Sequence, residues 1–467
     1  MSQFSDKLGF YIDRARLTEQ QLARVSGFTR SYIALMKSGL RISPNTEKMS
    51  KLIAALNLTP YEREELWADY MRAKFGDDTY ELRKQMLSLI RSFGSVPSLS
   101  IRSLASHEIP DVGTVNGRVN VESMIKAVLE KEASREQGFL RLILQPVEES
   151  VLSLIQSVLV ASPRLQIEQI ISLEQDISEL SGKLYNLKAF QWIVQLMSAS
   201  RMGGYRSYYY YDRIQAHFNS GTLFPFLILA SDYALLLSLD LESAMVFHQQ
   251  DQISLLLKVF EGQKQSCTKI GVSVQEYRRL LKFRLPVIPD TGKMYFMGSQ
   301  PYLTLSASPS MVQKYLSSDP EMRDDALRIL NKESLLFSRG DPAVLYFTRK
   351  GLKRFMETGA VDILGQEIRF EKADRRRLLD RLIHMAEDGA VRPYLLDEAL
   401  LEYPKELIVA AYDRKQINVL YMPDQPELRM GIEEHTLQEM IYSFLEALES
   451  SQYVLSVHET LKYLKKV

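Results

Sequence analysis

The sequence predicts a multidomain protein in which an all-α domain of five helices precedes an α/β (α+β) effector region. The 467 residues exceed what one hydrophobic core holds, the first 75 residues carry helical spacing, and strand-like apolar runs alternate with helices after residue 139. The expected divisions are a helical domain, a helix with a linker, an α/β domain, and an α+β effector and dimerisation region, at residues 1–75, 76–100, 101–220 and 221–467.

Helical spacing and capping residues define the first two helices. Four apolar residues near the start recur every three or four positions: Phe4, Leu8, Tyr11 and Ile12. Thr18 can cap the next helix, with Gln21 at the reciprocal position of a capping box. Gly27 can end that helix in the left-handed conformation, which glycine adopts at little cost.

A third helix is expected to start at once. Thr29 caps it, and Ile33 and Met36 face inward, which leaves its first turn exposed. A first turn of this kind can present side chains to base edges in the major groove of DNA. The candidates for base-edge contact are Thr29, Arg30, Ser31 and Tyr32. Arg30 is the best candidate for a bidentate contact with guanine.

Two further helices complete the domain, and its charge is locally basic. Ser43-Pro44 is expected to open the fourth helix, and Thr59-Pro60 with Glu62 supplies a cap, a first-turn proline and a box glutamate for the fifth. The whole chain balances at 58 basic and 58 acidic residues. Residues 14–51 nevertheless carry eight basic and two acidic side chains, a local charge of +6 where a phosphate backbone would lie.

Two short helices around a glycine, flanked by three more, resemble the phage-repressor and Cro-like (XRE-type) family of bacterial helix-turn-helix regulators over about the first 75 residues. The resemblance implies phosphate contacts that position the domain. The candidates for these contacts are Gln20, Lys37, Ser38, Arg41 and Asn45. Glu19 stands where a phosphate-contacting glutamine is common, and Lys37 where a glutamate is usual, so one expected contact is weakened and Lys37 would replace it.

Beyond residue 76 the pattern changes. Residues 77–93 predict one more helix, and residues 94–98 a linker. Strands at 139–144 and 165–173 then alternate with helices at 149–160 and 183–200. A hairpin, a short strand and a helix appear twice, at 226–261 and 407–450. This order suggests a duplicated unit, with chance recurrence of common elements as the alternative.

No motif for catalysis, a cofactor or a metal is present. The sequence has no phosphate loop, no His-Glu-x-x-His and no Gly-x-Ser-x-Gly elbow, and its six histidines are scattered. We therefore expect no enzymatic activity, no cofactor and no metal. The order of elements after residue 139 also suggests a phospholipase-D-like nuclease fold, but the His-x-Lys signature of that fold is absent.

Five tyrosines between residues 205 and 211 follow two glycines and are interleaved with arginine. We interpret this loop-to-helix segment first as a packed core or interdomain face, and second as the wall of a ligand pocket hinged at the glycines. Stacking on nucleic-acid bases is a third possibility. The pocket candidates are Tyr205, Arg206, Tyr208 and Tyr210. The triple arginine 375–377 lies in a predicted amphipathic helix and is expected to form its solvated face. Nearby acidic residues argue against a second nucleic-acid patch there.

Cysteine usage and hydropathy indicate a cytoplasmic protein with no membrane partner. Cys267 is the single cysteine, the start lacks a signal pattern, and no apolar run is long enough to span a bilayer.

These patterns predict a transcription regulator, such as a repressor, whose amino-terminal domain binds a double-stranded DNA operator. The remaining residues would form a homodimer and sense a small-molecule or peptide effector. One alternative is an antitoxin-like or protein-interaction module, which salt-dependent binding to a duplex would distinguish. The other is an enzyme with a divergent carboxy-terminal site, which turnover in a substrate screen would reveal.

Overall fold

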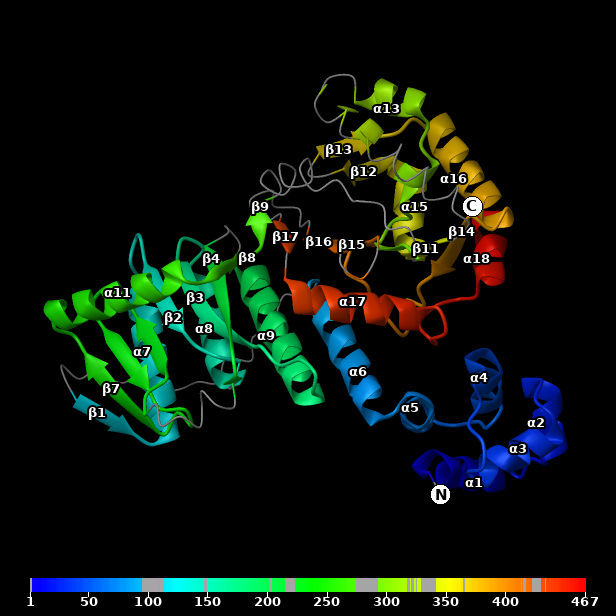
Figure 1. Cartoon of the computed structure of the whole chain (residues 1–467), viewed down its shortest axis with the longest axis horizontal. Helices are drawn as coiled ribbons and strands as arrows, with labels where there is room; N and C mark the ends of the chain where they lie inside the picture. Colours follow the sequence, from blue (N-terminus) through cyan, green and yellow to red (C-terminus); the bar gives the residue numbers. More distant parts are fainter. Residues whose placement is uncertain are drawn as a thin grey trace.

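An amino-terminal helical domain, one connecting helix and two α/β units follow one another in the computed structural model (Figure 1). The structure describes residues 2–94, 109, 113–146, 149–200, 204–214, 223–273, 293–316, 320, 323–324, 326–328, 342–363, 366–412, 414, 417–421, 430–432 and 434–467.

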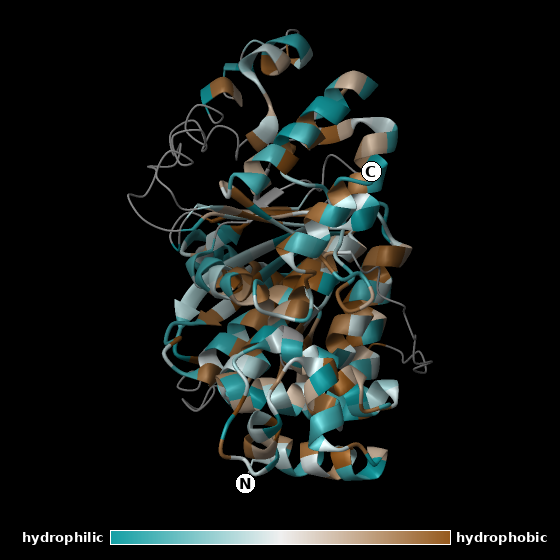
Figure 2. Cartoon of the chain, turned by 90° about the vertical axis from the view of Figure 1, so that its right-hand side faces the viewer, coloured by the Kyte–Doolittle hydropathy of each residue, from teal (hydrophilic) through white to brown (hydrophobic). Residues whose placement is uncertain are grey.

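The amino-terminal domain contains the five helices that the sequence predicts. They are α1 (Gln3–Ala15), α2 (Glu19–Ser26), α3 (Arg30–Lys37), α4 (Thr46–Ala54) and α5 (Pro60–Phe75). Each helix turns apolar side chains into one shared core, which includes Phe4, Leu22, Ile33, Met49 and Trp67. In Figure 2 these helices carry both hydrophobic and hydrophilic residues, as expected of amphipathic helices that bury one face.

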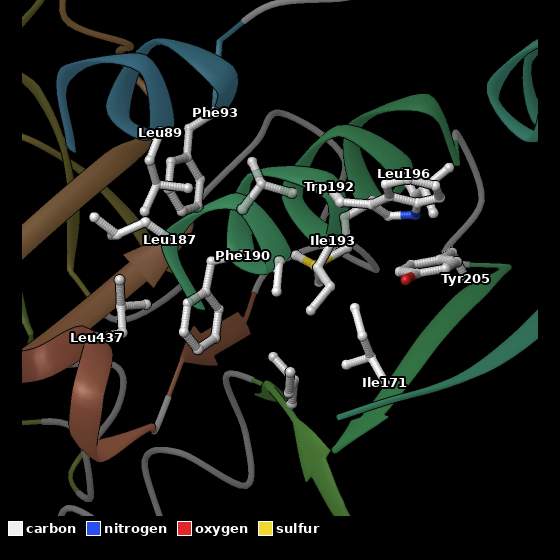
Figure 3. Close-up of a cluster of buried hydrophobic side chains, with 14 of the residues drawn as sticks. Leu89, Phe93, Ile171, Leu187, Phe190, Trp192, Ile193, Leu196, Tyr205 and Leu437 are labelled. Atoms are coloured by element: carbon white, nitrogen blue, oxygen red, sulfur yellow. The ribbon is translucent and has the colours of Figure 1, made fainter. Parts of the chain in front are cut away.

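The connecting helix α6 (Asp77–Ser92) follows α5 after Gly76 alone and confirms the helix expected at 77–93. It packs against α9 (Leu180–Ala199) and α17 (His435–Leu448), which belong to different α/β units. Figure 3 shows Leu89 of α6 and Phe93, the residue after α6, beside Leu187 of α9, with Leu437 of α17 nearby. Residues 95–98 of the expected linker lie outside the described residues.

The first α/β unit is built on a sheet with the order β1-β7-β6-β5-β2-β3-β4-β8 in the described residues. Its strands are β1 (Gly113–Asn116), β2 (Phe139–Ile143), β3 (Gln166–Glu174), β4 (Tyr205–Asp212), β5 (Phe226–Leu229), β6 (Ala234–Leu237), β7 (Ser243–Phe247) and β8 (Thr268–Ile270). Helices α7 (Arg118–Ala133), α8 (Glu149–Ala161) and α9 cover one face. Helix α11 (Gln250–Gln265) covers the other.

The second unit has a sheet with the order β14-β11-β10-β15-β16-β17-β9 in the described residues. Its strands are β9 (Val272–Ser273), β10 (Tyr295–Met297), β11 (Ala343–Phe347), β14 (Val391–Leu395), β15 (Leu407–Ala411), β16 (Ile417–Tyr421) and β17 (Met430–Ile432). Helix α17 covers one face. The other face packs on η1 (Leu303–Ser306), α13 (Pro309–Tyr315), α15 (Arg349–Thr358), α16 (Lys372–Glu387) and α18 (Val457–Leu464). Strands β12 (Ala360–Ile363) and β13 (Gln366–Arg369) form a separate hairpin.

The two units share one topology. In the first, β2, β3 and β4 pair in parallel, and the antiparallel strands β5, β6 and β7 continue the sheet from β2. In the second, β10, β11 and β14 are parallel, and β15, β16 and β17 continue it from β10. A helix follows the last strand of each series, α11 and α17. The hairpin-strand-helix order is thus present in both units, and three parallel strands precede it in each.

Two sequence predictions are wrong in this region. The boundary expected between residues 220 and 221 cuts through the first sheet, because β5 pairs with β2. The tyrosine segment is not a loop-to-helix segment but strand β4, which pairs along its length with β3. Long-range strand pairing decides both features, and local sequence patterns do not report it.

Candidate nucleic-acid interface

Helices α2 and α3 are capped as the sequence predicts. The Thr18 hydroxyl accepts a hydrogen bond from the backbone N–H of Gln21 at 3.3 Å, and the Gln21 side chain accepts one from the Thr18 N–H at 2.8 Å. Gly27 ends α2 with φ +74°. Thr29 caps α3 by accepting from the N–H of Tyr32 at 3.3 Å. These local bonds set the angle between the two helices and leave the first turn of α3 at the surface.

Three of the four base-edge candidates lie exposed on this turn: Thr29, Arg30 and Ser31. The Arg30 side chain is 75% exposed and contacts Glu19 through a single Nε–Oε2 pair of 3.4 Å. A surface pair of this kind contributes little, so the guanidinium can leave Glu19 for another acceptor. Glu19 stands where the resemblance implies a phosphate-contacting glutamine. In this structure it pairs with Arg30 instead.

Tyr32, the fourth candidate, is half-buried and held from two sides. Its ring stacks on Phe28 with centroids 5.4 Å apart, and its hydroxyl donates to the backbone oxygen of Ile42 at 3.3 Å. Tyr32 is thus positioned to shape the surface beside α3, and its hydroxyl already has a partner.

The segment 42–44, called the anchored loop below, is fixed to the domain by its carbonyl groups. Ile42 accepts from Tyr32, Ser43 accepts from the Tyr70 hydroxyl at 2.8 Å, and Pro44 accepts from Lys74 Nζ at 2.7 Å. Three successive carbonyls therefore have side-chain donors. Sequence analysis missed the roles of Tyr70 and Lys74, although their i,i+4 spacing on α5 places both on one helix face.

Asn45 follows the anchored loop and caps α4. Its Oδ1 accepts from the N–H of Lys48 at 2.9 Å, so the helix begins at Thr46 and not at the expected Ser43-Pro44. The anchored loop precedes the helix, because its carbonyl groups accept hydrogen bonds from side chains of α3 and α5. Asn45 remains exposed, as do Gln20, Ser38 and Arg41 among the phosphate candidates.

Ion pairs reduce the local basic charge. Lys37 Nζ lies 2.6 Å from Asp13 Oδ1, so the lysine that was expected to replace a phosphate contact has a carboxylate partner in this structure. Arg14 makes a two-bonded pair with Glu62, at 2.5 and 2.9 Å. That hydrogen bonding lowers the pKa of Glu62 to about 2. The acidic partners come from α1 and α5, outside the residues that give the local charge of +6.

The sequence of this domain matches a known protein family. Residues 11–63 match the family model described as Helix-turn-helix. The amino-terminal domain is a helix-turn-helix domain. The match includes α2, α3 and α4, together with all nine candidate residues for DNA contact. No curated protein matches the sequence of the chain.

Two solved structures are similar to the chain at low scores. The archaeal chromatin protein TrmBL2 has 11% identity and a TM-score of 0.21, and the match covers 58% of this chain and 95% of that one. The polyphosphate kinase of Porphyromonas gingivalis has 12% identity and a TM-score of 0.22, with 76% of this chain and 55% of that one covered. TM-scores this low do not establish a shared fold.

The four ligand candidates of the tyrosine segment do not share one pocket. Tyr205 is buried on the α9 face of the sheet, where Figure 3 shows it opposite Ile171, and its hydroxyl donates to Gln169 at 2.8 Å. Tyr208 and Tyr210 lie on the α11 face. Arg206 is exposed and lies 3.6 Å from Glu168. Successive side chains of a strand alternate between faces, which separates Tyr205 from the other three candidates. The expected hinge is also constrained, because a Cβ on Gly204 would lie 2.3 Å from the carbonyl oxygen of Leu165.

The described residues include neither a candidate metal-ligand cluster nor a helix that could span a membrane. No group of three His, Cys, Asp or Glu side chains there is arranged to hold a metal ion. None of the helices in that part of the chain is both long and apolar enough to cross a membrane.

Proposed function

We propose that the protein is a sequence-specific transcription regulator whose helix-turn-helix domain docks in the major groove of double-stranded DNA. The exposed first turn of α3 carries this proposal, since Thr29, Arg30 and Ser31 stand at the surface beside the anchored loop. Arg30 would read a guanine through its fork of donors. Gln20, Ser38, Arg41 and Asn45 would contact phosphates and fix the register. Lys37 would do so after leaving Asp13.

The remainder of the chain would dimerise and respond to a small-molecule or peptide effector. Its two α/β units provide several hundred residues beyond what a dimer contact needs. We place this regulator in the bacterial cytoplasm, on the strength of the resemblance of the first 75 residues and the single cysteine.

The experiment begins with genome-wide recovery of bound DNA and footprinting of the recovered site. Arg30→Ala should weaken binding to the specific site by about 1 to 3 kcal/mol and relax the sequence preference at one base pair. Arg63→Ala is the matched control, because Arg63 is also an exposed arginine and lies on α5, outside the helix-turn-helix pair. An unchanged footprint in Arg30→Ala would show that the register assigned to α3 is wrong, and a wild-type protein without any footprint would reject the function.

A further inference from the structure

Two cations share one aromatic ring where the helix-turn-helix domain meets α6. Lys74 Nζ lies 4.7 Å, and the Arg83 guanidinium carbon 4.0 Å, from the centroid of the Phe75 ring. Lys74 belongs to the last turn of α5 and Arg83 to α6. Gly76 alone separates the two helices, with φ +86° and open space where a Cβ would stand. The pair therefore lies on both sides of a one-residue joint.

Neither cation has an acidic partner in the described part of the chain. Lys74 donates to the Pro44 carbonyl, and the Arg83 guanidinium has only its contact with the Phe75 ring. Arg72, two residues before Lys74, differs in this respect, because Asp69, Asp77 and Glu81 all lie within 4.0 Å of its guanidinium. Acidic residues are thus available at this joint and are directed to Arg72 instead of the pair.

Holding two like charges together in a half-buried place is unfavourable. Burial lowers the pKa of Arg83, and burial together with the nearby Arg83 lowers the pKa of Lys74. Cation–π contact with the Phe75 ring recovers part of that cost. An anion in contact with both cations would offset the repulsion and could accept hydrogen bonds from the Arg83 guanidinium, whose contact in the described residues is with the Phe75 ring.

The pair also lies next to the proposed DNA-binding surface. Lys74 is the side chain that fixes Pro44 of the anchored loop, and Asn45, a candidate for phosphate contact, is the next residue. A DNA phosphate that contacts Asn45 would therefore lie near Lys74. Both members of the pair lie beyond residue 63, where the family match ends.

We propose that Lys74 and Arg83 bind a phosphate group, supplied by the DNA backbone when the helix-turn-helix domain docks. The inference rests on the proposed function and adds a contact outside the matched family region. A phosphate bridging the two residues would also fix the angle at Gly76. Because α6 packs against α9 and α17, that contact would tie the bound domain to both α/β units.

The test measures how DNA affinity of the full-length protein depends on salt. Lys74→Gln and Arg83→Gln should each lower the slope of log affinity against log salt by about one, for all duplex sequences alike. Lys84→Gln is the matched control, because it removes the same charge from an exposed position next to Arg83 and should leave the slope unchanged. Melting temperatures of all variants show whether each is folded at the assay temperature.

A second arm identifies the source of the phosphate. Thermal melting of wild type is followed in inorganic phosphate and in sodium chloride of equal ionic strength. One outcome is that phosphate raises the melting temperature of wild type but not of the two variants, while the salt dependence of DNA affinity is the same in all three proteins. That result would retain the phosphate site and overturn DNA as the source of the phosphate. Unchanged slopes with no phosphate effect would overturn the proposal altogether. The second arm needs no DNA, so it still tests the pair if Arg30→Ala shows that the proposed function is wrong.

Discussion

At the residue scale, neighbouring side chains of one type have different roles. Arg375 donates to the carbonyls of Met356, Glu357, Thr358 and Phe370, at 2.7 to 3.1 Å, and so satisfies the carboxy-terminal end of α15. Arg376 pairs with Asp380 on the surface, one turn along the same helix. The solvated face expected for residues 375–377 is therefore wrong for Arg375, because its partners come from a helix that lies elsewhere in the sequence.

Arg375→Ala should reduce the free energy of unfolding by roughly 2 kcal/mol, because it leaves helix-end carbonyls without a charged donor. Arg376→Ala should change it by less than about 0.5 kcal/mol, since exposed i,i+4 ion pairs contribute little. Urea denaturation of both variants measures the difference. Equal effects of the two substitutions would contradict the role assigned to Arg375.

At the scale of the element, α6 is packed into the α/β units and is not merely a linker. Its apolar side chains Met86, Leu87, Leu89 and Ile90 are buried in the core shared with α9 and α17. Phe93, just beyond the helix, packs on Tyr421 with ring centroids 5.5 Å apart. The helical domain, in contrast, has its own core, which reaches from Phe4 to Met71.

A fragment of residues 1–76 should therefore melt cooperatively without binding a dye for exposed apolar surface. A fragment of residues 1–93 should bind that dye or self-associate, because it exposes the α6 side chains that α9 and α17 cover in the full chain. Dye fluorescence and sedimentation compare the two. A monomeric 1–93 fragment that binds no dye would show that α6 buries this face without the α/β units.

At the scale of the whole molecule, the two α/β units are joined at the edges of their sheets. Strand β8 pairs with β4 of the first sheet, Gly271 follows with φ +78°, and β9 pairs with β17 of the second sheet. Tyr211 of β4 donates to Glu434, the residue that caps α17. Helix α9 of the first unit also packs on α17 of the second, and α6 links both units to the helix-turn-helix domain.

We predict that the full-length chain is a two-fold dimer through residues beyond 94. One small domain contacts too little duplex for specific affinity, and such domains usually bind half-sites about 34 Å apart. Analytical ultracentrifugation at micromolar concentration tests this, with the 1–76 fragment as the monomeric control. A monomeric full-length chain that still binds its site specifically would contradict the prediction.

The sequence by itself determined the helix-turn-helix domain, because its capping bonds, left-handed glycine and apolar spacing act within three or four residues. It also identified the alternating strands and helices and the order that repeats. The tertiary structure decided which strands share a sheet, which face each tyrosine of β4 occupies, and which cations have acidic partners. Asp13 lies 24 positions from Lys37, and Ser43 lies 27 from Tyr70. Contacts between residues so far apart follow from the packing of whole elements, and local sequence patterns carry no record of that packing.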